Sequence, residues 1–169
     1  MKLLSTLALA LLSSSVPRFV AADTDSPICN NKLIKGSYAF TLEGQIQLPN
    51  QSGPSPEIGV VIQTFDGQSN GSDGQGALTV IVTAVVGGGV SADGATGTGT
   101  YKVYSDCTGT FTQNVNGKTI IASFVIAQNG NEIYTVVISP TGFTVRTLGK
   151  RQFVLPEKDS RHGERSDEG

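Results

Sequence analysis

The chain has 169 residues, of which 15% are charged, 21 are glycine and none is tryptophan. This length is enough for one domain with its own core, and a glycine-rich, charge-poor composition is typical of many short strands and tight turns. Residues 23–149 carry five Lys and Arg against nine Asp and Glu, a net charge of −4. A surface of this sign repels phosphate, so the sequence argues against nucleic-acid binding.

The N-terminus has the pattern of a secretory signal peptide. A positive Met1-Lys2 precedes an apolar run over residues 3–12, and small residues end the segment near Ala22. The run is too short to cross a bilayer core of about 30 Å, and a buried N-terminal helix is the alternative. We therefore expect a signal peptide over 1–22, no membrane anchor, and a protein that is secreted or held in the secretory lumen.

Two cysteines and two sequons fit an exported protein. Cys29 and Cys107 predict a disulfide in an oxidising compartment, the alternative being two free thiols. Asn50 and Asn70 each begin an N-glycosylation sequon in polar, turn-rich surroundings.

Runs of alternating or β-branched residues between turn signals predict about eight strands. A hairpin over 118–139 has Asn129-Gly130 at its turn, and Asn116-Gly117 predicts a second turn of the same type I′. This hairpin is apolar on both faces, so we expect it to be covered on both sides. The remaining strands are expected at 36–48, 58–65, 77–86, 98–104, 106–115 and 143–148.

Strands of this kind, joined by short connections in chain order, favour an all-β fold. We expect a single antiparallel up-and-down barrel over 23–149, followed by a charged, disordered tail over 150–169. An immunoglobulin-like sandwich is the main alternative, but the chain lacks a core Trp and Cys29 precedes the first strand. The doubly apolar strands also suggest an outer wall covered by another subunit, that is, a homo-oligomer.

The sequence excludes several kinds of chemistry. The single histidine, His162, lies in the expected tail, and both cysteines are assigned to a disulfide. We therefore expect no metal site, no Ser-His-Asp or Cys-His catalysis and no cofactor. Carboxylates, phenols and a few cations remain.

Glu43 and Arg146 are the charged candidates because both lie in the middle of a strand. If their faces point into a barrel, they act in an apolar cavity where pKa values shift; if the faces point outward, they are ordinary solvated charges. Tyr134 is a candidate hydrogen-bond donor, although core tyrosines of this kind are more often structural.

Several segments resemble a family of small secreted β-barrel proteins from bacteria and filamentous fungi, calycin-like or allene-oxide-cyclase-like in shape. They are LIKGSYAF from Leu33, TFDGQ from Thr64, GTYKVYSDCTGT from Gly99 and GNEI from Gly130. Fungal members include hetero-Diels–Alderases of tropolone–sesquiterpene pathways. The resemblance covers most of residues 30–149 through turn and strand signatures, and it carries no site residue over to this chain.

The resemblance implies a cofactor-free cyclase acting on an apolar polyketide or terpenoid intermediate. Such a reaction needs two groups held in a reactive pose and one or two hydrogen-bond donors. Our hypothesis assigns Tyr134 and Arg146 as donors and Glu43 to proton transfer. The apolar ligand-binding wall is then made by Tyr38, Phe40, Tyr101 and Phe124.

Two alternatives stay open at this point. One is a secreted, non-catalytic barrel that binds a small apolar ligand, which needs the same cavity with a few polar anchors. The other is a structural or effector protein whose barrel is filled by side chains.

Overall fold

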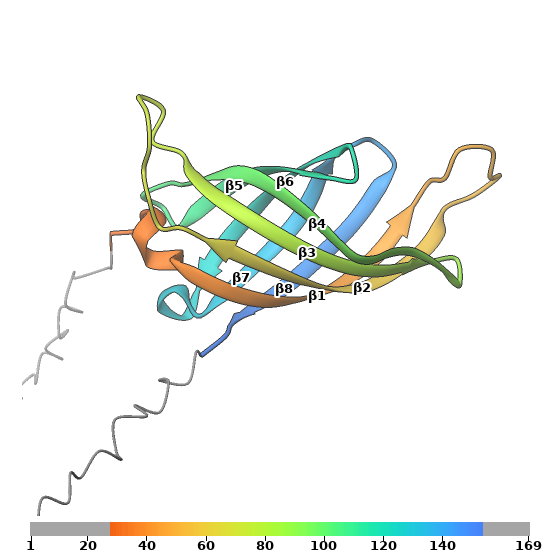
Figure 1. The fold of residues 1–169 in the computed structure, drawn as a ribbon, viewed down its shortest axis with the longest axis horizontal. Coiled ribbons are helices and arrows are strands. Elements are labelled where there is room, and N and C mark those ends of the chain that lie inside the picture. The colour runs from red at the N-terminus through yellow and green to blue at the C-terminus, as the bar shows by residue number, and fades with distance from the viewer. Residues whose placement is uncertain (1–27, 154–169) are drawn as a thin grey trace, which may run out of the picture.

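Eight antiparallel strands form a closed barrel in which each strand pairs with its chain neighbours and β1 pairs with β8 (Figure 1). The computed structural model describes residues 28–153. The ring confirms the predicted all-β barrel and excludes the two-layer sandwich. The strands are β1 (Gly36–Ile46), β2 (Ser55–Phe65), β3 (Gly76–Val86), β4 (Gly89–Val103), β5 (Thr108–Val115), β6 (Lys118–Ala127), β7 (Glu132–Ser139) and β8 (Phe143–Arg151).

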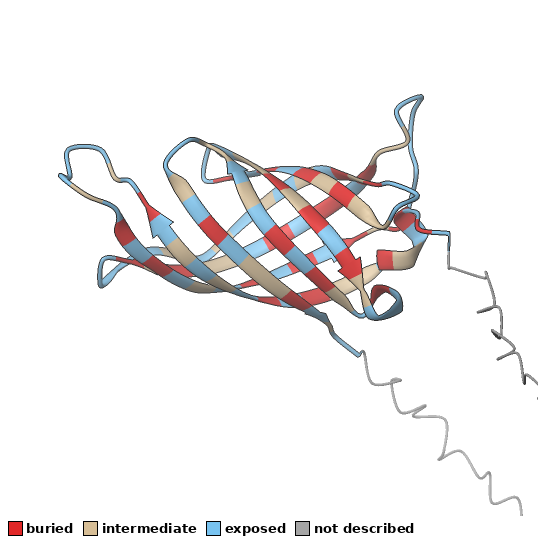
Figure 2. Ribbon diagram, turned by 180° about the vertical axis from the view of Figure 1, so that it is seen from behind, coloured by how far each residue is buried: buried red, intermediate tan, exposed pale blue. Residues whose placement is uncertain are grey.

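Alternation along each strand decides which side chains enter the barrel. Successive side chains of a strand point to opposite faces, and Figure 2 shows buried and exposed residues alternating along the ribbons. In β1, Tyr38 and Phe40 are buried while Thr41 and Glu43 are exposed. The same alternation in β2, β3 and β5 brings the inner faces together as the core of the molecule.

Both predicted hairpins are confirmed, but only Asn116-Gly117 forms the predicted two-residue type I′ turn. Asn129 and Gly130 have φ values of 54° and 82°, and Asn116 and Gly117 have 51° and 75°. Positive φ at both central residues is the requirement of a type I′ turn, which Asn and Gly meet at least cost. Val115 lies opposite Lys118, as a two-residue turn requires. Ala127 lies opposite Glu132, so the second hairpin closes through the four residues 128–131, and Gln128 also has a positive φ of 50°.

Three strands extend beyond their predicted bounds. β4 begins at Gly89 rather than at 98, because a tight turn at Gly87 and Gly88 (φ of 57° and 86°) returns the chain directly onto β3. Residues 89–97 are rich in Gly and Ala and carry little strand propensity, so pairing with β3 determines their conformation. β2 begins at Ser55, and β8 continues to Arg151 into the segment expected to be a tail.

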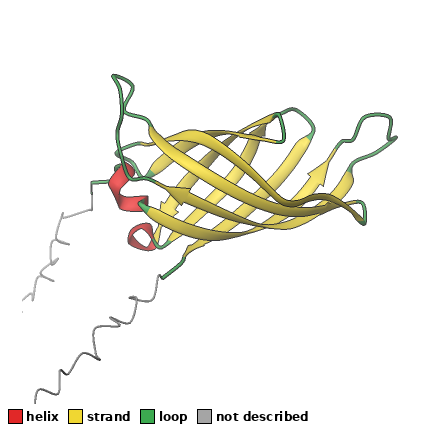
Figure 3. Ribbon diagram, in the orientation of Figure 1, coloured by secondary structure: helices red, strands yellow, loops and turns green. Residues whose placement is uncertain are grey.

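One end of the barrel is closed by two short 3₁₀ helices, η1 (Asn31–Ile34) and η2 (Gln128–Gly130) (Figure 3). The Cys29–Cys107 disulfide ties the segment before η1 to the β4–β5 turn, which confirms the predicted pairing. It joins residues 78 apart in the chain. Closing a loop of that size stabilises a fold by up to about 4.5 kcal/mol in the chain-entropy model.

The outer wall carries exposed aliphatic side chains, which corrects one expectation. Ile58 and Val60 of β2, and Val125, Val136 and Ile138 of β6 and β7, are all exposed. The 118–139 hairpin is therefore apolar on both faces as predicted, but no described part of the chain covers its outer face. A homo-oligomer remains a prediction. Among residues 28–153, no helix is long and apolar enough to span a membrane.

Candidate functional site

A cavity of about 190 Å³ occupies the half of the barrel opposite η1. It extends to Asn116 and Pro140, which lie at the β5–β6 and β7–β8 turns, so its mouth is at that end. An apolar cavity of about 150 Å³ holds benzene, so the enclosed space accommodates about one ring and a larger molecule extends through the mouth. The apolar lining includes Phe40, Val61, Val82, Ala84, Phe111 and Val145.

Aromatic side chains fill the other half of the barrel and form the floor of the cavity. Phe65 meets Tyr38 and Tyr101 edge to face, with ring centroids 5.6 and 4.9 Å apart. Such pairs add stability beyond their buried area. Phe124 lies against Gly109, where an added Cβ would lie 2.2 Å from the ring, so glycine is required for the close approach.

Arg151 joins η1 and η2 to the barrel at its closed end. Its guanidinium donates to the carbonyl oxygens of Lys35 and Leu33 at 2.5 Å each and of Gly130 at 2.9 Å. It also lies 5.0 Å from the centre of the Tyr38 ring, and the Tyr38 hydroxyl donates to the same Gly130 oxygen. Charge-assisted bonds of this kind are roughly twice as strong as neutral ones. The last residue of β8 therefore binds both helices to the barrel wall.

Two buried glutamines meet inside the barrel and line the cavity. Gln63 of β2 donates from Nε2 to Oε1 of Gln113 on β5 at 2.7 Å, and the two residues are 3% and 8% exposed. β3 and β4 separate these strands in the sheet, so the bond crosses the interior. An amide pair joined by one hydrogen bond still has one oxygen and several N–H groups for another partner.

Thr135 of β7 lines the same cavity and carries a buried hydroxyl with no partner. The residue is 6% exposed, and its Oγ1 makes no hydrogen bond. An unpaired buried hydroxyl costs about 1–3 kcal/mol, so the position is unfavourable for folding alone.

Two charged residues also line the cavity. Glu57 is 9% exposed, and burial raises the pKa of its carboxyl, while the positive charge of Lys118 partly lowers it. Lys118 is exposed at the β5–β6 turn.

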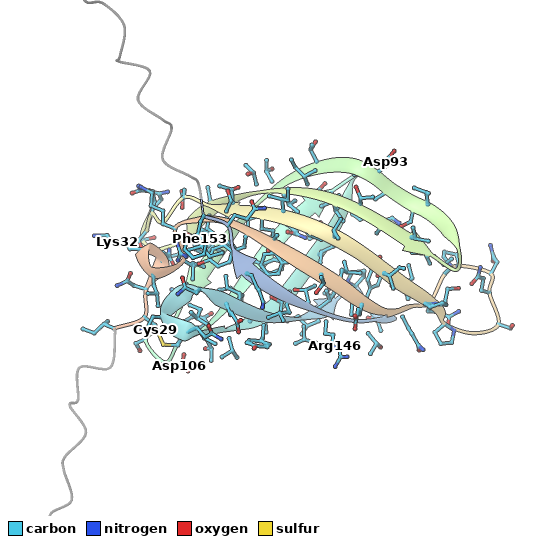
Figure 4. All side chains as sticks on the ribbon, turned by 90° about the horizontal axis from the view of Figure 1, so that it is seen from below. Cys29, Lys32, Asp93, Asp106, Arg146 and Phe153 are labelled. Carbon is cyan, nitrogen blue, oxygen red and sulfur yellow. A yellow bond between two sulfur atoms is a disulfide. The ribbon has the colours of Figure 1, made fainter. Side chains whose placement is uncertain are left out.

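The three predicted catalytic residues lie together, but on the outside of the barrel. Glu43 and Arg146 are cross-strand partners, 3.5 Å apart between Oε2 and a guanidinium nitrogen, with side chains 65% and 81% exposed. Figure 4 shows Arg146 pointing away from the wall. Tyr134 is exposed and donates to Glu132 at 2.9 Å. Each has the outward parity of its strand, so none of the three side chains faces the interior of the barrel, and a catalytic role for them stays a prediction.

The four predicted wall residues all point inward, and one of them lines the cavity. Phe40 lies at the boundary between the filled and the hollow half. Tyr38, Tyr101 and Phe124 are buried in the aromatic floor, away from the cavity lining. Burial raises the pKa of the Tyr38 phenol to about 12, and the nearby Arg151 opposes this shift. Burial likewise raises the pKa of Tyr101, whose hydroxyl accepts from the Gly67 amide.

The sequence contained a signal for Gln113 that the prediction missed. Gln113 has the same strand parity as Phe111 and Val115, whereas Gln63 shares its parity with Glu57 and the apolar parity of β2 is the other one. A polar residue in an apolar register is the pattern of a buried polar anchor. Thr135 offered no such signal, because its strand is apolar on both faces.

The remaining observations concern the glycosylation sites, metal ligands and similarity to known proteins. Asn50 and Asn70 are exposed, as a glycosylation site requires. Within residues 28–153, no three His, Cys, Asp or Glu side chains gather in a way that could hold a metal ion. Comparison with protein-family models, curated proteins and solved structures finds no match to the chain.

Proposed function

We propose that this protein binds one small, largely apolar molecule in the open half of its barrel. The observation that carries the proposal is the cavity itself, which is open at one end, closed at the other and lined mainly by aliphatic and aromatic side chains. Ligand sites are typically concave and apolar with a few polar groups that fix orientation. The Gln63–Gln113 pair and Thr135 supply such groups.

A filled barrel is the alternative that this cavity disfavours. The aromatic floor forms the packed core of the barrel, whereas the side chains toward the mouth leave the cavity unfilled. Proteins retain cavities of this size at a cost in stability, because surrounding groups lose dispersion contacts. A binding role accounts for that cost.

The experiment measures the binding of a neutral apolar dye, N-phenyl-1-naphthylamine, by its fluorescence. Ala84 is buried in β3 and lines the cavity, so Ala84→Leu places three additional carbons in the enclosed space. We expect the wild-type protein to bind the dye and Ala84→Leu to weaken binding at least tenfold, at an unfolding midpoint close to that of the wild type. Ala39→Leu, the same change on the outer face of β1, is the control and should bind normally. Equal binding by both variants would place the dye outside the cavity.

The candidate activity at this site is a cofactor-free cyclisation, as in the hetero-Diels–Alderases that the sequence resembles. Holding a flexible substrate in a reactive pose and donating a hydrogen bond to its carbonyl supply the two effects that such a reaction needs. The glutamine pair and Thr135 take the donor role first assigned to Tyr134 and Arg146, because they line the cavity.

This activity is tested with a neutral substrate that carries a diene and an enone in one chain. We expect turnover above the uncatalysed rate, lost in the double variant Gln63→Leu/Gln113→Leu and retained in Glu43→Gln, Tyr134→Phe and Arg146→Ala. Binding without rate enhancement would leave the carrier role alone. Loss of turnover in the outer-wall variants would return the active site to the outer wall.

A secretory location belongs to the same proposal. The Cys29–Cys107 disulfide is typical of oxidising compartments, and the exposed sequon residues Asn50 and Asn70 are positioned for glycan attachment. A mass shift on treatment of the protein from a eukaryotic host with an endoglycosidase tests the glycans.

A further inference from the structure

We infer that the cavity selects a ligand whose buried end carries a neutral hydrogen-bond acceptor, such as a ketone or ester carbonyl, over a hydrocarbon or a carboxylate. This inference rests on the proposed binding function and names the chemistry of its ligand. The donors are the Thr135 hydroxyl and the remaining N–H groups of the Gln63–Gln113 pair.

The unpaired hydroxyl of Thr135 is the feature that points most directly to a ligand. This hydroxyl is buried and unpaired, although valine has the same shape and would avoid the cost of burial. Threonine in a strand has more than one accessible χ1 rotamer. Rotation about χ1 can thus turn the hydroxyl toward a bound carbonyl without moving β7.

The glutamine pair supplies a second, independent reason. A single hydrogen bond of 2.7 Å joins the two amides, so the other N–H groups of both side chains remain free to donate to a ligand in the cavity. Both side chains are neutral, and neutral donors stabilise a carbonyl oxygen without requiring a counter-charge.

The charges around the cavity disfavour a carboxylate. Lys118 is the one cation among the described lining residues, and it is exposed at the mouth near the carboxyl of Glu57. An anion buried at the glutamine level would have no positive partner there. Burying an unpaired charge is costly, so a fatty-acid-like anion is rejected unless its carboxylate stays outside the mouth.

The test compares three probes of nearly equal size: acetophenone, α-methylstyrene and benzoate at pH 7. The first two differ only in C=O against C=CH₂, and each places one ring in a cavity that holds about one ring. We expect acetophenone to bind up to about tenfold more tightly than α-methylstyrene, the worth of one hydrogen bond, and benzoate to bind most weakly. Dissociation constants come from ligand-observed NMR titrations.

Variants assign the preference to the proposed groups. Thr135→Val should reduce the ketone preference and raise the unfolding midpoint of the unliganded protein, because it removes an unpaired buried hydroxyl. Thr135→Ser keeps the hydroxyl and should keep the preference. Thr112→Val, on the exposed face of β5, is the matched control and should change neither. Gln63→Leu/Gln113→Leu removes both amides together and should also reduce the preference.

The outcomes separate the two proposals. If none of the three probes binds, the proposed binding function is overturned. If acetophenone and α-methylstyrene bind the wild type equally, or if the ketone preference survives in both Thr135→Val and the double glutamine variant, the cavity binds apolar molecules and the inferred selectivity is overturned. If benzoate binds more tightly than acetophenone, the ligand is an anion.

Discussion

The two halves of the barrel are built from the same eight strands, yet one half is filled and the other is hollow. The inward residues of β1 show how this arises: Tyr38 and Phe40 lie toward η1, followed by Leu42, Gly44 and Ile46 toward the mouth. The aromatic rings lie at the η1 end and smaller, non-aromatic side chains lie toward the mouth, while the inward parity is constant. In our proposal, the filled half stabilises the fold and the hollow half binds the ligand, so changes in one half should leave the other largely intact.

The largest expected effect is a difference in stability between matched aromatic truncations. Phe65→Ala removes a ring at the centre of the aromatic floor and should cost about 3–5 kcal/mol of unfolding free energy. Phe143→Ala, at the cavity lining of β8, removes a half-buried ring beside existing space and should cost far less. Denaturant unfolding of the two variants measures both values. Equal costs would mean that the halves share the stabilising role.

How much of this division could be predicted depends on the strand. Alternation in β1 predicted the inward set, because polar residues such as Thr41 and Glu43 occupy the other parity. In β2 the outward parity carries Ile58, Val60 and Ile62, so the hydrophobic pattern alone pointed to the wrong face. In β3, β6 and β7 both faces are apolar, so periodicity could not decide which side chains enter the barrel. The start of β4 was missed for a different reason: residues 89–97 have weak strand propensity, and pairing with β3 is a tertiary effect.

The candidate site was harder to predict than the fold because charge was given more weight than parity. Glu43 and Arg146 attracted attention as mid-strand ions, yet an exposed cross-strand pair of this kind contributes at most about 1 kcal/mol and is common on barrel walls. Gln113 carried the more informative pattern, a neutral polar side chain in an apolar register. Its partner on β2 could be identified only from the closed ring, because 50 residues separate the two.

A second prediction concerns alkaline pH and the closed end. The pKa of Tyr38 is raised to about 12 by burial, so the folded state holds the phenolic proton more tightly than the unfolded chain. The resulting stability is fully present below the unfolded pKa of about 10 and is lost as pH rises toward 12. We expect unfolding free energy to fall by up to about 2 kcal/mol over this range, with Tyr101 acting in the same direction.

Tyr38→Phe tests the assignment to this residue. It should cost about 1 kcal/mol at pH 8, through loss of the hydrogen bond to the Gly130 oxygen, and should flatten the profile between pH 10 and 12. Tyr104→Phe, at an exposed tyrosine, should leave the profile unchanged. An unaltered slope in Tyr38→Phe would exclude Tyr38 as the group responsible.

The smallest expected effect lies in the hollow half and has the opposite sign. Burial raises the pKa of Glu57 above its unfolded value, although Lys118 partly opposes this. The folded state then favours the protonated carboxyl, a contribution that is present below the unfolded pKa of about 4.3 and is lost as pH rises through the folded pKa. Above the folded pKa, the buried carboxylate therefore reduces stability. At pH 7, Glu57→Gln should have a slightly higher denaturant midpoint of unfolding than the wild type, and this difference should shrink toward pH 4.

Glu43→Gln is the matched control on the outer wall, where the carboxylate is solvated and paired with Arg146. It should be neutral or slightly destabilising at pH 7, because it removes a weak exposed ion pair. Opposite signs for the same substitution at two glutamates would show that the open half retains an ionisable group at a cost in stability. A destabilising Glu57→Gln would instead mean that attraction to Lys118 outweighs burial, and that the mouth is held together by charge.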